Sequence, residues 1–114
     1  METKELRLFD VVLACFPYQE GDAKKLRPGL VLEVGLNGVR LAYGTSNYAL
    51  AHSAMCFVTV PDSSNQLARP TIFQMDHTEF IPSEDVRRRL GRLSKRDRQA
   101  AIDALMARYK RLHT

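Results

Sequence analysis

The sequence predicts a mainly β domain, a small barrel-like antiparallel sheet with helices at its C-terminal end. Short apolar runs rich in β-branched residues recur through the first 81 residues, and turn-forming residues separate them. Runs of this kind are typical of short strands. From Ser83 onward the apolar residues recur instead at helical spacing. Helices that follow such strands are expected to pack across one face of the sheet.

The first two expected strands span residues 9–16 and 30–34. Both are apolar at almost every position, apart from Asp10 in the first. Such runs indicate strands that are buried on both faces. Residues 19–25 lie between the strands and carry two acids, a glycine and two lysines. This stretch is expected to be a solvated loop.

Three more strands are expected at residues 39–43, 55–60 and 71–81. Asn37-Gly38 favours a tight turn before the first of them. Polar residues near Asp76 interrupt the last. The stretches between these strands, residues 44–53 and 62–69, are expected to be loops, with one short helical turn in the first.

Two helices are expected after the strands. Ser83 offers an N-cap for a short helix that reaches about Leu90, and Gly91 ends it. Ser94 offers the next N-cap, with Asp97 three residues on as in a capping box. The apolar face of this second helix is expected to comprise Ala101 or Ile102, Leu105, Tyr109 and Leu112.

Length and composition favour a single domain over residues 1–114 that belongs to the cytoplasm. The 114 residues include 45% hydrophobic and 26% charged side chains, which is ordinary for a globular protein. No apolar stretch is long enough for a signal peptide or a membrane span. Cys15 and Cys56 lie in apolar runs, so buried thiols are expected, with a disulfide or metal site as the alternative. Without ligand spacings such as CxxC, neither a metal nor another cofactor is expected.

The net charge of +4 is unevenly distributed. Residues 84–114 hold 10 of the 17 basic side chains and 4 of the 13 acidic ones. A basic segment favours a polyanionic partner, and the alternative is a solvated helix face.

Four motifs occur in a recognisable order. They are Phe16-Pro17-Tyr18 after the first strand, Arg27-Pro28 before the second, Gly44-Thr45-Ser46 after the third, and residues 67–82 with Gly91-Arg92-Leu93-Ser94 beyond them. This order resembles the PemK/MazF family of bacterial toxins over nearly the whole chain. The resemblance implies an SH3-like barrel, a homodimer, and a metal-independent endoribonuclease that cleaves single-stranded RNA and is inhibited by a segment of its antitoxin.

The resemblance also implies a site built around Arg27 and Thr45, which are expected to face each other across one cavity. The planar guanidinium of Arg27 suits a phosphate, because it can bind two oxygens and is always charged. The hydroxyl of Thr45, assisted by Ser46, can donate to a phosphate oxygen, although it can equally bond its own backbone in a turn.

The later strand departs from the better-known toxins. Where several of them carry Arg-x-Asp, this chain has Gln74-Met75-Asp76. Asp76 is a candidate acid or base, whereas Gln74 can hydrogen-bond a substrate but cannot transfer a proton. His77 suits proton transfer, but neighbours on a strand point to opposite faces unless a bulge intervenes.

Other candidate RNA-binding residues lie in the first loop. Lys24 and Lys25 can attract the RNA backbone, and Tyr18 can stack on an unpaired base. Two alternatives to a nuclease remain. One is an inactive barrel that binds a protein, as a gyrase-inhibiting branch of this fold does, and the other is a nucleic-acid binder that uses the cluster Arg87–Arg89.

Overall fold

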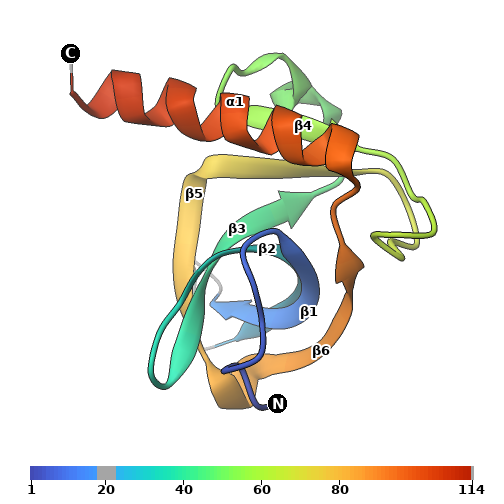
Figure 1. Ribbon diagram of the computed structural model, residues 1–114, viewed down its shortest axis with the longest axis vertical. Helices are drawn as coiled ribbons and strands as arrows, with labels where there is room; N and C mark the ends of the chain where they lie inside the picture. The colour runs from blue at the N-terminus through green and yellow to red at the C-terminus, as the bar shows by residue number, and fades with distance from the viewer. Residues whose placement is uncertain (18–22, 114) are drawn as a thin grey trace.

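A computed structural model describes residues 1–17 and 23–113. In this part of the chain, six strands form one antiparallel sheet in the order β4-β5-β3-β2-β1-β6 (Figure 1). The strands are β1 (Asp10–Pro17), β2 (Lys24–Val34), β3 (Gly38–Thr45), β4 (Cys56–Thr59), β5 (Thr71–Pro82) and β6 (Val86–Arg92). Helix α1 (Lys95–Leu112) follows them, and the 3₁₀ turns are η1 (Tyr48–His52) and η2 (Ser83–Asp85). The five expected strands are confirmed, in a curved sheet that is not closed, although β2 begins at Lys24, earlier than the expected strand over residues 30–34 and inside the expected loop.

The expected helix over residues 83–90 is wrong. Only the turn η2 forms there, and the chain then continues as β6, which pairs with β1. Val86 and Gly91 are buried in this strand. The pairing satisfies the backbone of β1 along a whole edge, and this gain outweighs the local helical pattern. Ser83 does not cap a helix, and its hydroxyl lies 2.8 Å from that of Thr3.

Both faces of the sheet carry a core, which explains why β1 is apolar on both of its faces after Asp10. One core lies under α1 and includes Val11, Leu30, Phe73, Ala101 and Ala104. The other includes Val12, Phe16, Val31, Leu41 and Val86. The two sets alternate along β1 and β2, as the side chains of a strand must.

Helix α1 begins as expected, and its expected apolar face is confirmed only in part, at Ala101 and Leu105, which pack against the core. Ser94 Oγ accepts a hydrogen bond from Asp97 N at 3.2 Å, which confirms the N-cap. The buried residues of the helix are Ala101 and Ala104, whereas Ile102, Tyr109 and Leu112 of the expected apolar face are exposed. Small side chains let the helix approach the large side chains of the sheet closely.

Strand β5 contains a bulge where polar residues interrupt its sequence. Thr78 lies opposite Ala42 of β3, but Gln74 lies opposite the next residue, Tyr43. Residues 75–77 are therefore extra on β5 and have no pairing partners on β3.

Both cysteines are free thiols, and Cys56 is buried while Cys15 is half-buried. Burial raises the pKa of the Cys56 thiol, against the smaller opposing effect of a hydrogen bond with Ser53. In residues 1–17 and 23–113, no helix is long and apolar enough to cross a membrane. No group of three or more His, Cys, Asp and Glu residues in those ranges is placed to hold a metal ion.

Candidate functional site

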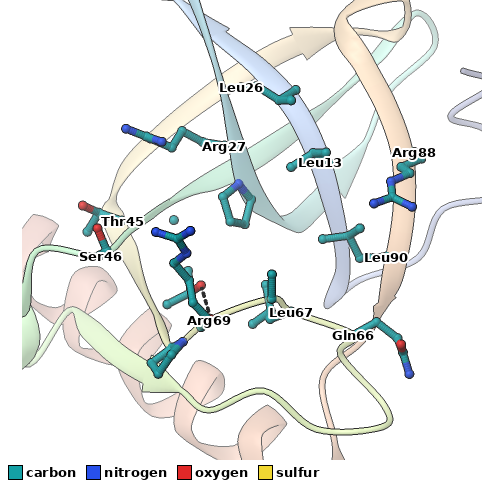
Figure 2. Close-up of a pocket in the computed structure, with 15 residues that line it drawn as sticks. Leu13, Leu26, Arg27, Thr45, Ser46, Gln66, Leu67, Arg69, Arg88 and Leu90 are labelled. Carbon is teal, nitrogen blue, oxygen red and sulfur yellow. Dashed lines mark hydrogen bonds between the residues drawn. The ribbon is translucent and has the colours of Figure 1, made fainter.

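A pocket of about 360 Å³ opens at the rim of the sheet, where β1, β2, β3 and β6 meet the segment 66–71 (Figure 2). Part of its lining is apolar and comes mainly from Leu13, Pro28, Leu67 and Leu90. The polar part contains Arg27, Arg69, Arg88, Thr45, Ser46, Gln66 and Thr71. No carboxylate is among the described residues that line it. Three positive charges beside hydroxyl groups suit a ligand that carries phosphate.

Arg27 is half-buried on β2, where it pairs with Ala14 of β1. Pro28 follows it opposite Leu13 and fixes the backbone φ beside the arginine. The Arg27 Nε donates a hydrogen bond to Tyr43 Oη at 3.3 Å. A guanidinium that is tethered in this way loses less side-chain entropy when it binds an anion.

Thr45 lies at the end of β3 and lines the same pocket as Arg27, with Ser46 beside it (Figure 2). Its Oγ1 accepts a hydrogen bond from Asn47 N at 3.2 Å, so the turn contact expected of such a residue is present. Because the hydroxyl oxygen accepts in this bond, its hydrogen can still be donated to a ligand. The structure thus brings Arg27, Thr45 and Ser46 together.

Arg69 and Arg88 also line the pocket, although neither was predicted to belong to the site around Arg27. Arg69 lies on the side of the pocket that carries Thr45, and Arg88 stands on the other side (Figure 2). Arg69-Pro70 repeats the dipeptide that drew attention to Arg27, and this repetition could have identified it. Arg88 could not be placed, because its segment was expected to be helical.

The loop that carries Arg69 is held in place by Asn65, which is completely buried. Asn65 Oδ1 accepts hydrogen bonds from Asp62 N at 3.1 Å and from Leu67 N at 2.9 Å. Its Nδ2 donates to Val60 O at 2.9 Å. One side chain therefore closes the loop and directs Leu67 into the core.

The same loop rests on β6 at Gly91. Arg92 N donates a hydrogen bond to Ser64 O at 2.8 Å, and a Cβ on Gly91 would collide with that oxygen. Gly91 was expected to end a helix. Its function in the structure is to let a loop approach a strand closely.

Gln74 and Asp76 lie outside the lining of the pocket. Gln74 is half-buried on β5, where it lies opposite Tyr43 of β3 on one side and Cys56 of β4 on the other. Asp76 is exposed on the β5 bulge, and its Oδ1 accepts a weak hydrogen bond from the Cys56 thiol at 3.8 Å. His77 stacks on the ring of Tyr43, with centroids 4.7 Å apart. Asp76 and His77 therefore have different neighbours despite the bulge.

The predicted RNA-binding residues of the first loop do not line the pocket either. Lys24 Nζ forms an ion pair with Asp85 at 2.7 Å, and this hydrogen bond raises the pKa of Lys24. Lys25 of β2 lies opposite Phe16 of β1. Tyr18 lies outside the described residues.

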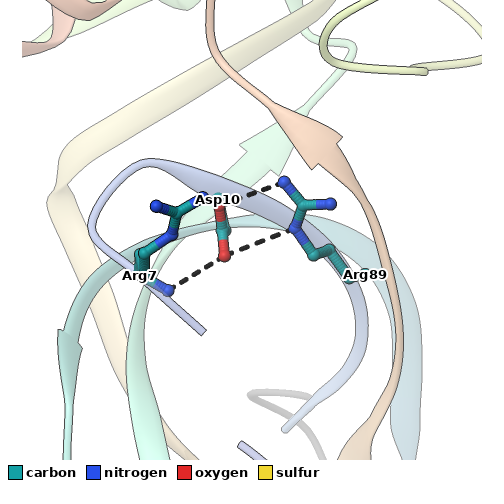
Figure 3. Close-up of polar contacts among 3 residues, drawn as sticks. All are labelled: Arg7, Asp10 and Arg89. Atoms are coloured by element: carbon teal, nitrogen blue, oxygen red, sulfur yellow. Dashed lines mark hydrogen bonds and ion pairs between the residues drawn. The ribbon is translucent and has the colours of Figure 1, made fainter. Parts of the chain in front are cut away.

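The cluster Arg87–Arg89 does not act as one unit. Arg88 lines the pocket, whereas Arg89 pairs with Asp10 on β1 (Figure 3). Two nitrogens of Arg89 lie 3.4 Å from the two Asp10 oxygens, and Arg7 N donates to Oδ2 at 2.9 Å. The carboxylate of Asp10 is buried, whereas the Arg89 side chain is 44% exposed, and the ion pair offsets the charge of Arg89.

No family model and no curated protein matches the chain. Solved structures do match it. The Mycobacterium tuberculosis toxin MazF-mt6 superposes with a TM-score of 0.66 at 23% identity, over 87% of this chain and 96% of that one. An Mtb toxin superposes with a TM-score of 0.60 at 27% identity, over 71% of this chain and 90% of that one. The chain therefore has the PemK/MazF-like toxin fold.

Proposed function

We propose that this chain is the toxin of a toxin–antitoxin pair and cleaves single-stranded RNA without a metal. The observation that carries the proposal is the pocket in which Arg27 and Thr45 lie beside two further arginines, with no carboxylate among its described lining residues. The MazF-like fold supports the same function.

In this reaction the RNA supplies its own nucleophile. The 2′-oxygen attacks the adjacent phosphorus, its proton leaves to a base, the bond to the 5′-oxygen breaks, and that oxygen takes up a proton. Negative charge grows on the phosphoryl oxygens as the new bond forms, and fixed donors lower the barrier most at this point. Arg27 supplies charge and two donors, and Thr45 and Ser46 supply hydroxyl donors. Asp76 lies outside the pocket lining and takes no part in this scheme.

Arg69 and Arg88 bind the phosphates on either side of the scissile one. They stand on different sides of the pocket (Figure 2), and single-stranded RNA carries one charge per nucleotide. The same positive surface suits an acidic antitoxin segment, which competes with RNA for it. The resemblance to the toxin family makes a homodimer the expected assembly.

The test is cleavage of single-stranded RNA in EDTA by the parent protein and Arg27→Ala. The variant should lose about 100-fold or more in rate, because it lacks a preorganised donor to the transition state. Arg87→Ala is the matched control, since Arg87 is exposed on β6 and is not among the pocket residues. Cleavage by Arg27→Ala at the parent rate would refute the assignment.

Arg88→Ala should weaken RNA binding and lower the slope of log affinity against log salt by about 0.7, the value for one phosphate of a single strand. Arg87→Ala should leave that slope nearer the parent value. If Arg88→Ala and Arg87→Ala changed this slope by the same amount, the assignment of Arg88 to an RNA phosphate would be contradicted.

A protein or nucleic-acid binder without nuclease activity is the second candidate. The position of Asp76 favours it, since the only acid of the Gln74-Met75-Asp76 motif lies outside the pocket lining. RNA that is bound in the pocket but remains uncut in EDTA would support this candidate.

A further inference from the structure

Tyr43 provides a hydrogen-bond acceptor for the Arg27 Nε, at 3.3 Å. A guanidinium has five N–H donors in a planar fork, one on Nε and four on the two terminal nitrogens. With Nε bound to the phenol, the terminal nitrogens can meet two oxygens of a phosphate end-on. Arg89 differs, because its Nε and a terminal nitrogen both face the Asp10 carboxylate (Figure 3).

The ring of Tyr43 is held on two sides. Phe16 meets it edge-on, with centroids 5.0 Å apart and planes at 79°. His77 stacks on it at 4.7 Å, with planes at 11°. The bulge of β5 at residues 75–77 carries His77 at this position. These two contacts restrain the position of the Tyr43 hydroxyl. The hydrogen bond from Arg27 Nε to that hydroxyl then restrains the guanidinium as well.

Gly29 completes this arrangement on the neighbouring strand. It lies opposite Tyr43 and is buried. A Cβ at this position would lie 3.0 Å from Phe16 Cζ and 2.9 Å from Leu41 Cδ1. The missing side chain leaves the room in which Phe16 packs against the tyrosine. Gly29 thus pairs with Tyr43 across the strands, and Arg27, two residues earlier, binds the Tyr43 hydroxyl.

We infer that Tyr43 is a positioning residue for Arg27, which it orients so that the terminal nitrogens of the guanidinium receive a phosphate. This inference rests on the proposed function of the pocket. A base-stacking role for Tyr43 fits less well, because the residue is half-buried and one ring face is covered by His77.

Tyr43→Phe tests the inference, since it removes the hydroxyl and keeps the ring. The kcat for RNA cleavage should fall about 10- to 100-fold, the cost of a misplaced catalytic group. KM should change less than about twofold, because the interaction is lost mainly in the transition state. Tyr48→Phe is the matched control, since Tyr48 is exposed on η1, and it should cleave at the parent rate. An unchanged kcat in Tyr43→Phe would overturn the inference.

The Arg27→Ala background separates positioning from mere structural support. In that background Tyr43→Phe should have no further effect on kcat, because there is no guanidinium left to orient. A loss of the same factor in both backgrounds would overturn the inference, as would a large fall in the thermal midpoint of Tyr43→Phe itself.

A spectroscopic test does not depend on cleavage. In ¹H–¹⁵N spectra, Tyr43→Phe should shift the Nε–H resonance of Arg27 and leave that of Arg89, which is held by Asp10. An unshifted Arg27 resonance would overturn the inference even in an active enzyme. A parent protein that cuts no RNA would defeat only the proposed function. In that case the Nε–H resonance of Arg27 remains the deciding measurement, and its failure to shift in Tyr43→Phe would overturn the inference.

Discussion

Asn65→Ala should lower the free energy of unfolding markedly, because one buried side chain closes the loop that carries Arg69. The side chain is completely buried and makes three hydrogen bonds, to Asp62 N, Leu67 N and Val60 O. Its removal leaves two backbone donors and one acceptor without their partner. Each such loss costs about 1 kcal/mol net, and more where water cannot enter. The sum is about 3–4 kcal/mol.

Part of this loss is recovered locally. Gln66, next to Asn65, has a φ of 55°, a left-handed conformation that is unfavourable for a residue other than glycine. A loop released from Asn65 can relax this backbone and regain about 1 kcal/mol. The net destabilisation should therefore be about 2–3 kcal/mol, a large fraction of the stability of a small domain.

The assay is urea unfolding at neutral pH, with the midpoint and slope fitted for each variant. Asn47→Ala is the matched control, since Asn47 is exposed and its Oδ1 accepts a single bond, from Ala49 N at 3.1 Å. It should cost about 1 kcal/mol or less. If the two variants unfolded within about 0.5 kcal/mol of each other, the reasoning about Asn65 would be refuted.

Two further predictions concern packing and titration. Gly91→Ala should destabilise the protein by about 1–3 kcal/mol in the same urea assay, because the new methyl group collides with Ser64 O. Gly35→Ala is its control, since its nearest new contact would be a Phe80 ring carbon at 3.1 Å, and equal losses would contradict the packing argument. Burial raises the pKa of Cys56 in the folded state. As the pH rises, the thiol therefore ionises in the unfolded chain before it ionises in the folded protein. The free energy of unfolding should fall as the pH rises above about 8.5, because ionisation then favours the unfolded chain. Urea titrations at several pH values should show a smaller alkaline fall in Cys56→Ala, and identical slopes would count against the raised pKa.

Much of the fold could be predicted because its signals are local. The apolar run of β1 indicated burial on both faces, and cores on both sides of the sheet account for it. Ser94 was predicted to cap α1, and a capping hydrogen bond reaches only three residues along the chain. Polar residues near Asp76 marked the β5 bulge, since a run of polar side chains does not fit a regular buried ladder.

The neighbours of the candidate site were harder to predict. The resemblance to the toxins singled out Arg27 and Thr45, but the contact of Arg27 with Tyr43 joins two strands and leaves no trace in local composition. Arg88 and Arg89 are adjacent in the sequence. The first lines the pocket and the second pairs with Asp10, because β6 lies beside β1.

By itself, the sequence indicated where strands alternate with turns, where α1 begins, and that Arg27, whose planar guanidinium suits a phosphate, lies next to a buried apolar run. Only the tertiary structure decided that residues 86–92 form a strand, that Ala104 rather than Tyr109 and Leu112 is buried on α1, and that Arg27 shares its pocket with Arg69 and Arg88. The physical reason is the separation along the chain of the residues that interact. Caps, turns and apolar periodicity depend on neighbours along the chain, whereas strand pairing and the grouping of like charges depend on segments tens of residues apart that meet only when the chain is folded.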